Sequence, residues 1–516
     1  MSVPRKLSPT RLPGRLLLAL AFTLLAFTTI LHAQTSAAPI LSHHYIVIYR
    51  NATIPGDAET RIHAVGARLI QRHERFGIAS VLSSSLDPDD VTMRRLRAQP
   101  NVDYVLHDRI VTATHLHTRS IPHPTFSVVV NTAHPYDTFY TSPQGWAVRQ
   151  VGGYGSNIPG GPASGPWDTT MGKGVRIAIL DSGVDATHPD IAPNLALNLS
   201  EVVQTDLPSP CDDGTPQDQQ GHGTWTASLA AAALGPGTGQ LIGVAPSASI
   251  LNIKVLQRMP ASFSGDAATL AASCTSGGAA GLLSWVIQGI DDAVSNHADI
   301  ISLSLGATID LTTGDGAGLK AAFDTVTYAA SQSGAILIAA AGNDAYDLSN
   351  PRYLEIPAQS RGVLAVVAST NPACAENLSS GATCVSGPTT LAYYSNHGAP
   401  LNALAAPGGS YPIGSDLAIS GWVRGACSSG KPSTTDGLPA DASHSFGCFD
   451  LGHTPYVQAI GTSAAAPLAA GVAALLRAAH PTWDATHIID VMRSTAITTP
   501  QLSVPQVNAA AALLAP

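Results

Sequence analysis

The sequence predicts an α/β protein with a mainly parallel sheet covered by helices on both faces, preceded by a small α+β domain. Two patterns support this fold class. From residue 174 onward, short and nearly continuous apolar runs alternate with helical stretches, as in parallel strands that are buried on both sides. The chain before residue 116 contains three strand-like and two helix-like segments, which indicate the small α+β domain. Hydrophobic residues make up 45% of the 516 residues, which excludes wholesale disorder.

The first 33 residues have the pattern of a secretory signal peptide. Four basic side chains precede an apolar run over 16–31, and a small residue, Ala33, follows it. Sixteen apolar residues are short for a membrane span, and no other stretch of the chain is long and apolar enough to cross a bilayer. We therefore expect cleavage near Ala33 and a secreted protein, extracellular or periplasmic, without a stable membrane anchor.

Residues 41–115 are expected to form the small α+β domain. A helix is expected to begin at residue 88, with Asp87 as its N-cap and Pro88 at its first position. A stretch rich in His, Thr and Pro follows, so 116–145 is assigned as a linker and N-terminal arm. The expected elements of this domain are strands at 45–49, 79–86 and 102–106 and helices at 58–72 and 88–98.

Residues 146–505 are expected to form the main α/β domain, with a C-terminal tail at 506–516; the Ala-rich residues after Pro500 fit either a last helix or a frayed tail. In open parallel sheets the chemistry gathers at the carboxyl ends of the strands, so the candidate site is sought there. The expected strands are 175–180, 248–255, 300–305, 335–340 and 363–368, and the expected helices are 283–297, 317–331 and 463–479.

Charge is distributed unevenly along the chain. Residues 1–115 hold 13 Lys and Arg against 8 Asp and Glu, a net charge of +5, whereas the rest holds 13 against 27, a net charge of −14. The larger part has no stripe of basic residues, which argues against a nucleic-acid partner. Only 12% of residues are charged, about half of the usual ~25%.

All six cysteines follow residue 115, and none forms a Cys-x-x-Cys pair, which disfavours zinc. An even number of cysteines behind a signal peptide indicates three disulfides, and the sequence alone leaves the pairing open. The local candidates are Cys374–Cys384 and Cys427–Cys448, which would leave Cys211–Cys274.

Four polar residues stand at the ends of strands or the starts of helices in the main domain. Asp181 follows an apolar strand, His222 lies between two glycines, Asn343 follows another strand, and Ser463 begins a helix of small residues. Each alone is more often a turn or capping residue. Together they supply a nucleophile, a base, a carboxylate that orients the base, and a donor for an oxyanion.

These residues stand in motifs that resemble those of the subtilisin-like serine proteases (subtilases), in the same Asp, His, Ser chain order. The resemblance covers about residues 146–492. It rests on ILDSGVD at 179–185 with HPD at 188–190, GHGT at 221–224, GVAP at 243–246, SLG at 304–306 and GTSAAAP at 461–467. Residues 43–114 likewise resemble the inhibitor-type propeptide of that family.

The resemblance implies a role for each motif residue. Asp181 would orient the imidazole, His222 would act as general base and then acid, and Ser463 would be the nucleophile. Asn343 and the Ser463 N–H would form the oxyanion hole. The expected substrate-binding strand contains Ser302, Ser304, Leu305 and Gly306. The low charge of the chain favours apolar or small side chains next to the scissile bond.

Some positions depart from the family pattern. Trp225 stands where a second histidine is usual, and Ser302 replaces a common asparagine. Catalysis by such a triad needs no cofactor. Structural calcium is left unassigned: Asp190 matches a position that contributes to one calcium site of the family, and Asp212 and Asp213 are an adjacent acidic pair.

The expected function is that of a secreted serine endopeptidase, made as a precursor that processes itself near residue 115. Its partners would be protein or peptide substrates and its own propeptide, which would act as intramolecular inhibitor and folding aid, and the protein is expected to be a monomer. Two alternatives are a catalytically silent binding module and a relative of the acid-active serine–carboxyl peptidases. The latter use a glutamate where this chain has His222.

Overall fold

A computed structural model describes the chain from residue 40 to its end, with gaps. The described ranges are 40–84, 88–113, 145–156, 164–234, 241–264, 266–275, 277–312, 315–370, 389–409, 423–429, 448–450 and 455–516. The expected signal peptide, most of the linker, Asp87, Cys374 and Cys384 lie outside these ranges.

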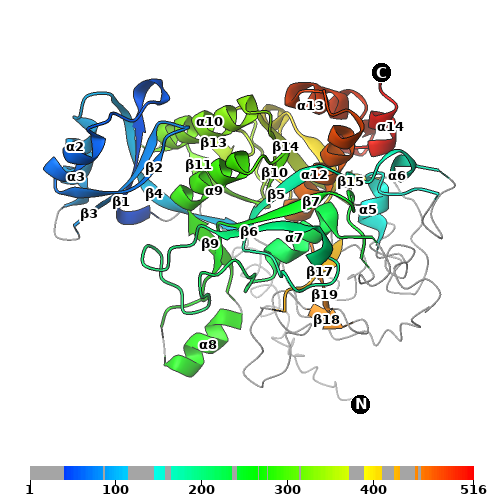
Figure 1. Ribbon diagram of the computed structural model, residues 1–516, viewed down its shortest axis with the longest axis horizontal. Helices are drawn as coiled ribbons and strands as arrows, with labels where there is room; N and C mark the ends of the chain where they lie inside the picture. Colours follow the sequence, from blue (N-terminus) through cyan, green and yellow to red (C-terminus); the bar gives the residue numbers. More distant parts are fainter. Residues whose placement is uncertain are drawn as a thin grey trace, which may run out of the picture.

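A ten-stranded sheet forms the centre of the molecule, in the order β20-β21-β16-β14-β12-β10-β5-β7-β6, with β15 beside β14 (Figure 1). All neighbours from β6 to β21 run parallel, and only β15 and β20 are antiparallel additions. The strands are β5 (Arg176–Asp181), β6 (Leu195–Ser200), β7 (Ser249–Lys254), β10 (Ile300–Leu303), β12 (Ile336–Ala340), β14 (Val363–Thr370), β15 (Thr390–Leu391), β16 (Leu404–Pro407), β20 (Ile497–Thr499) and β21 (Leu502–Gln506).

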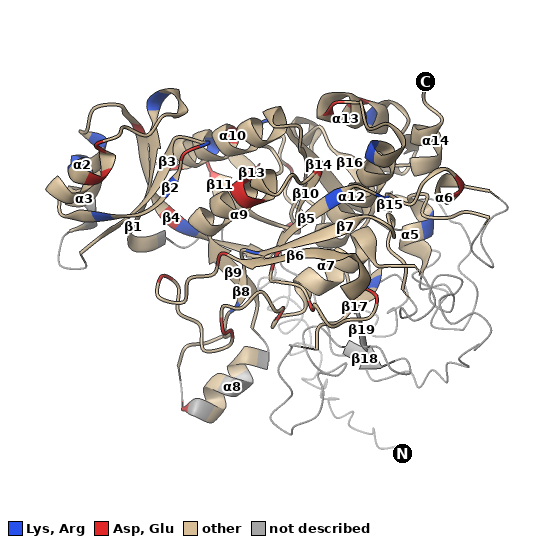
Figure 2. Ribbon diagram, in the orientation of Figure 1, with Lys and Arg blue, Asp and Glu red and all other residues tan. Residues whose placement is uncertain are grey.

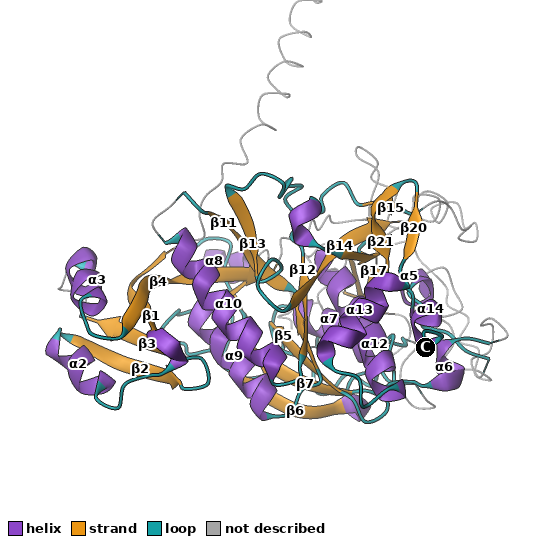
Figure 3. Ribbon diagram, turned by 90° about the horizontal axis from the view of Figure 1, so that it is seen from above, coloured by secondary structure: helices purple, strands orange, loops and turns teal. Residues whose placement is uncertain are grey.

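Helices cover both faces of this sheet, as expected (Figure 3). Alternate side chains of β5 show this directly: Ile177 and Ile179 join one hydrophobic cluster, and Ala178 and Leu180 join another. The first cluster contains the buried sides of α7 (His222–Ala231), α12 (Thr462–Ala479) and α13 (Ala485–Ser494). The second contains those of α9 (Leu283–Ser295) and α10 (Gly316–Gln332). The predicted α/β class is therefore confirmed.

The C-terminal residues end in a short helix and pack into the core. β21 adds to the sheet, and α14 (Ala509–Leu513) buries Ala509 and Ala512 in the first hydrophobic cluster. The remaining helices are α5 (Trp146–Gln150), α6 (Pro166–Thr169) and α8 (Ala267–Thr275), with short 3-10 turns at Arg50–Ala52, Ala192–Asn194 and Ala399–Leu401. A small antiparallel sheet holds β17 (Val423–Ala426), β18 (Cys448–Asp450) and β19 (Pro455–Ala459).

Residues 40–113, called here the N-terminal module, form an antiparallel sheet with two helices. Its elements are β1 (Ile40–Tyr49), α2 (Ala58–Ala64), β2 (Ala67–His73), β3 (Ile78–Ser83), α3 (Asp89–Arg97) and β4 (Val102–Ala113). The helix expected over 58–72 is wrong in its second half: Gly66, at φ +82°, follows the helix, and the chain turns into β2, which pairs with β3. The helix expected from residue 88 begins at Asp89, with Pro88 as N-cap.

β4 is longer than expected and joins the module to the main domain. Its middle pairs with β1, and its last residues lie between two strands of the main domain, β9 (Ala279–Leu282) and β11 (Leu305–Asp310). Together with β8 (Gln257–Arg258) and β13 (Tyr353–Ile356), these strands complete one eight-stranded sheet (Figure 1). β4 therefore enters the main domain as the central strand of a three-stranded antiparallel arrangement.

Lys and Arg residues are distributed over many of the described elements, with three arginines together in α3 (Figure 2). The expectation that no other stretch of the chain is long and apolar enough to cross a bilayer is wrong for one helix among the described residues, α12, but 83% of its apolar window is buried inside the protein. α12 is thus the central core helix of the main domain.

Candidate active site

Asp181 is the last residue of β5, at the carboxyl edge of the parallel sheet. It is fully buried, and both carboxylate oxygens have partners. Oδ1 accepts the backbone N–H of Ser182 at 2.7 Å, and Oδ2 accepts the hydroxyl of Thr226 at 3.0 Å. The carboxylate is thereby held in one orientation.

His222 begins α7 and points its Nδ1 at Asp181, with 2.6 Å between Nδ1 and Oδ1. Because a carboxylate only accepts, Nδ1 carries the proton and Nε2 is the basic nitrogen. This close approach depends on glycine: a Cβ on Gly223 would lie 2.0 Å from the carbonyl oxygen of Gly183. The predicted pair of base and orienting carboxylate is therefore assembled.

Asp218 holds the turn that carries His222, and sequence reasoning missed it. Its fully buried carboxylate accepts the backbone N–H groups of Gln220, Gly221 and Thr224 and the hydroxyls of Ser182 and Thr224, at 2.7–3.0 Å. Burial, the largest effect, raises its pKa, and these hydrogen bonds oppose the rise. Its position four residues before the histidine was the only available signal.

Ser463 is the second residue of α12 and lies beside the end of β10. Its hydroxyl is 3.4 Å from the carbonyl oxygen of Ser304, and the Ser304 hydroxyl donates to the Ser463 carbonyl at 3.0 Å. Leu303 pairs with Leu180, so Ser304 and Asp181 are the next residues of two adjacent strands. α12 also packs on α7, which carries His222. The three triad candidates therefore share one edge of the sheet.

Asn343 follows β12 and is oriented by the start of α12. Its Oδ1 accepts both the backbone N–H and the hydroxyl of Thr462, each at 2.8 Å. Because the carbonyl oxygen is turned toward Thr462, the side-chain Nδ2 is directed to the opposite side of the Cγ atom. The predicted amide donor and the predicted nucleophile are thus held by adjacent residues of α12.

The model of the subtilase family matches residues 172–511, more than half of the chain. The chain belongs to the subtilase family. Members of this family are serine endopeptidases, so this subtilase is a hydrolase that acts on peptide bonds of peptides or proteins.

Individual relatives agree. Subtilisin E of Bacillus subtilis (strain 168) is 26% identical over 479 residues, covering 93% of this chain and 91% of the relative. Thermitase of Thermoactinomyces vulgaris is 36% identical over 177 residues, which cover 34% of this chain and 50% of the relative.

Solved structures share the fold. Fervidolysin from Fervidobacterium pennivorans, a keratinolytic enzyme related to subtilisin, gives a TM-score of 0.61 at 19% identity and covers 94% of this chain and 62% of its own. The epidermin leader peptide processing protease of Staphylococcus aureus gives 0.60 at 17% identity, with coverages of 91% and 97%.

The expected substrate-binding residues of this subtilase divide into two groups. Leu305 and Gly306 lie in β11 and pair with Ala113 and Thr112 of β4, so their backbone edge accepts an extended chain. Ser304 contacts Ser463, as described. Ser302 is a correction: it pairs with Ile179 on one side and Ile338 on the other, so its backbone has no edge left to bind a substrate.

Trp225, the unusual residue of the histidine motif, supports His222 by packing. It is fully buried, and its ring meets the imidazole edge-on, with the centroids 5.7 Å apart and the planes at 64°. Its Nε1 donates to the carbonyl oxygen of Val423 in β17 at 3.1 Å. The histidine that is usual at this position is thus replaced by a larger aromatic residue, which links α7 to β17.

The acidic pair considered for calcium has other partners. Asp212 is fully buried and forms an ion pair with Lys254, at 2.8 and 2.9 Å from Nζ to its two oxygens. Asp213 accepts the N–H and hydroxyl of Thr215, an ordinary turn contact. Within the described ranges, no group of three or more His, Cys, Asp or Glu residues is arranged to hold a metal ion.

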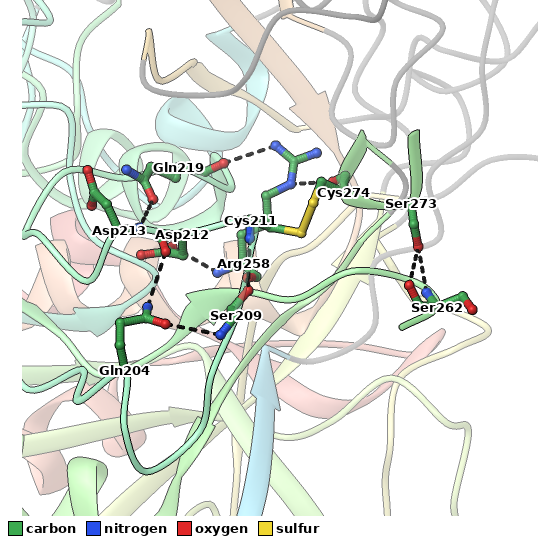
Figure 4. The surroundings of a disulfide bond; sticks show 10 residues. All are labelled: Gln204, Ser209, Cys211, Asp212, Asp213, Gln219, Arg258, Ser262, Ser273 and Cys274. Atoms are coloured by element: carbon green, nitrogen blue, oxygen red, sulfur yellow. Dashed lines mark hydrogen bonds between the residues drawn. A yellow bond between two sulfur atoms is a disulfide. The ribbon is translucent and has the colours of Figure 1, made fainter. Parts of the chain in front are cut away.

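A disulfide fastens the loop that precedes His222 (Figure 4). Cys211 is bonded to Cys274, 63 residues away, which is the pairing left over in the sequence analysis. Arg258, buried beside the bridge, donates to the carbonyl oxygens of Cys274 and Gln219. Cys427 is also disulfide-bonded. The loop before His222 is therefore cross-linked eleven residues before the histidine, and Arg258 adds a hydrogen bond three residues before it.

Proposed function

We propose that this subtilase is made as a secreted precursor, that it cuts itself just after β4, and that Asp181, His222, Ser463 and Asn343 carry out the cleavage. The observation that carries the proposal is the path of β4. Its last residues lie between β9 and β11 and run toward Ser304, which contacts Ser463. A peptide that binds by strand addition takes the same path.

The chemistry follows from the geometry of the site. Ser463 Oγ attacks the scissile carbonyl carbon while His222 Nε2 takes the hydroxyl proton, and Asp181 stabilises the imidazolium that forms. Asn343 Nδ2 and the Ser463 N–H donate to the oxyanion. His222 returns the proton to the leaving amine, and an acyl group remains on Ser463. A water molecule then gives a proton to His222 and attacks the acyl carbon. The proton passes to Ser463 Oγ as the acid is released.

The contacts of the N-terminal module favour an inhibitory role for it. Asp108 accepts the backbone N–H and the hydroxyl of Ser284 at the start of α9, at 3.2 and 2.5 Å. Arg75 pairs with Asp291 at 2.6 Å, and Arg109 donates to Asp315 at 3.4 Å. The basic N-terminal part of the chain thus meets the acidic main domain, and β4 occupies the edges that a substrate needs.

Mass spectrometry of the chain without residues 1–33, beside its Ser463→Ala variant, tests the proposal. We expect the wild type to split between residues 112 and 118 and the variant to stay whole. A wild type that folds but stays whole would refute self-processing. Labelling by a fluorophosphonate would then report separately on Ser463, because a catalytically silent binding module would not react. Expression of the full chain with its first 33 residues tests secretion through the loss of that segment.

A further inference from the structure

A buried carboxylate, Glu355, lies beside the cleft strand and has no role in the mechanism above. It stands in β13, opposite Thr308 of β11, and is 2% exposed. Sequence reasoning missed it because nothing in its local sequence distinguishes it. Its importance depends on three segments that meet around it.

Two of these segments present a glycine to the carboxylate. A Cβ on Gly306 would lie 2.6 Å from Glu355 Oε1, and a Cβ on Gly342 would lie 3.1 Å from Glu355 Cδ. Gly306 belongs to the strand that pairs with β4, and Gly342 directly precedes Asn343. Glu355 therefore lies against both the substrate-binding strand and the segment that carries the oxyanion donor.

The third segment fixes the orientation of the carboxylate. Asn396 is fully buried, and its Oδ1 accepts the backbone N–H groups of Asp344 and Tyr346 at 3.1 and 2.9 Å. Its Nδ2 must then face Glu355, where it donates to Oε2 at 3.4 Å, and the Thr308 hydroxyl donates to the same oxygen at 2.5 Å. With Oε2 held from two sides, Oε1 is the oxygen turned toward the glycines.

This buried acid lacks a basic partner. Its hydrogen-bond donors are neutral, and in the part of the chain that the structure describes no Lys, Arg or His forms an ion pair with it. Burial, with a smaller contribution from the exposed Asp344, raises the pKa of Glu355 to about 8, although the hydrogen bond from Thr308 lowers it. Tyr346, which stacks on Tyr353, is a further ionisable group near Glu355, and burial raises its pKa as well. Pairing with an incoming cation would offset the cost of charging this buried carboxyl group.

We infer that Glu355 forms the floor of the pocket for the side chain that precedes the scissile bond, and that it selects lysine or arginine there. A peptide that pairs with Leu305 and Gly306 and presents its carbonyl to Ser463 and Asn343 has this side chain between segments 304–306 and 340–342. Its ammonium or guanidinium group then meets Oε1. The apolar or small preference expected from composition is replaced by a cationic one.

The inference rests on the proposed protease function and adds the substrate class. The region of the first cut, 112–118, contains no Lys or Arg. That cut is intramolecular, and the high effective concentration of a tethered segment reduces its dependence on a well-fitted side chain. The selectivity therefore applies to substrates that arrive from solution.

Cleavage of a matched peptide series by the processed enzyme tests the inference. The peptides differ only in the residue before the scissile bond, which is Lys, Arg, Met or Leu. We expect kcat/KM to favour Lys and Arg over Met and Leu by about tenfold or more. Glu355→Gln should abolish this ratio, whereas Asp347→Asn, which removes an exposed carboxylate four residues after Asn343, should retain it.

The pH dependence provides a second readout. A cation in the pocket requires Glu355 to be ionised, so the Lys-to-Met ratio should rise as the pH rises from 6 to 9, and Glu355→Gln should remove the rise. If the variant fails to fold, competition on the wild type replaces it: butylammonium should inhibit cleavage of the Leu peptide at concentrations at which butanol does not.

The outcomes separate the two proposals. An enzyme that reacts with a fluorophosphonate and cleaves the Leu or Met peptides at least as well as the Lys and Arg peptides overturns only the role of Glu355. An enzyme that neither reacts nor cleaves any peptide overturns the protease function itself. A Lys preference that survives Glu355→Gln also overturns the inference, because another group would then bind the cation.

Discussion

Asp108 gives a quantitative test of how the N-terminal module docks. Its carboxylate is 3% exposed, at the N-terminus of α9, where two groups of Ser284 donate to it. Two effects oppose each other there. The end of a helix favours an anion by about 0.3–1 kcal/mol, up to ~2 kcal/mol when partly buried. Removal of the carboxylate from water disfavours it.

The structure indicates which effect is larger. Burial raises the pKa of Asp108 from 3.8 to about 6 even though the hydrogen bonds from Ser284 lower it, and Asp206 adds a smaller increase. A pKa raised to about 6 means that the charged form is disfavoured by about 3 kcal/mol relative to an exposed aspartate. Desolvation therefore outweighs the attraction of the helix end.

The sign of the pH dependence follows. Asp108 binds its proton more tightly in the folded precursor than in the unfolded chain. Its contribution to the free energy of unfolding is therefore greatest below pH 3.8 and is lost as the pH rises through about 6. Asn caps a helix about as well as Asp and stays neutral. Asp108→Asn should thus leave stability unchanged near pH 3.5 and increase it at pH 8, by up to about 3 kcal/mol.

Denaturant unfolding of the uncut precursor measures this difference. Both proteins carry Ser463→Ala, so that neither processes itself, and each is unfolded at pH 3.5, 5 and 8. A variant that is less stable than its parent at pH 8 would refute the reasoning, because the charge at the start of α9 would then be worth more than its desolvation. A difference that does not change with pH would also refute it.

Three further predictions concern the active site and its walls. Asn343→Ala should lower kcat by about 10²–10³ with little change in KM, as loss of one such donor does in subtilisin, and steady-state kinetics on a peptide checks it. Lys254→Met should cost about 3–5 kcal/mol in unfolding free energy, because it leaves Asp212 buried without its partner, and the double variant with Asp212→Leu should recover much of it. Replacing Cys211 and Cys274 by serine should cost about 4 kcal/mol, from the loop of 63 residues that the bridge closes, measured by thermal unfolding without reductant.

The sequence predicted best what depends on short-range patterns. Apolar strands that end in Asp181 and near Asn343, and a helix that begins beside Ser463, could be read from a few residues each. The helix expected over 58–72 failed because its apolar spacing fits both a helix and a strand, and Gly66 decides between them.

Other features depend on long-range contacts that local patterns do not contain. Glu355 is significant because residues 306, 342 and 396 surround it, and Ser302 lost its expected role because β5 and β12 occupy both of its edges. The reach of β4 to residue 113 depends on strands some 170 and 190 residues further along the chain.

The position of β4 between β9 and β11 limits what the enzyme can digest once the proposed processing has removed β4. Adjacent strands lie about 4.8 Å apart, so the two edges that β4 leaves behind are separated by about 10 Å, the space of a single extended chain. An α-helix with its side chains fills the whole width of this space. Its backbone N–H and C=O groups are already bonded within the helix, so they cannot pair with the two strand edges. A folded protein must therefore locally unfold a segment before it can be cut. The stability of the target, as well as its sequence, will set the rate at which it is degraded.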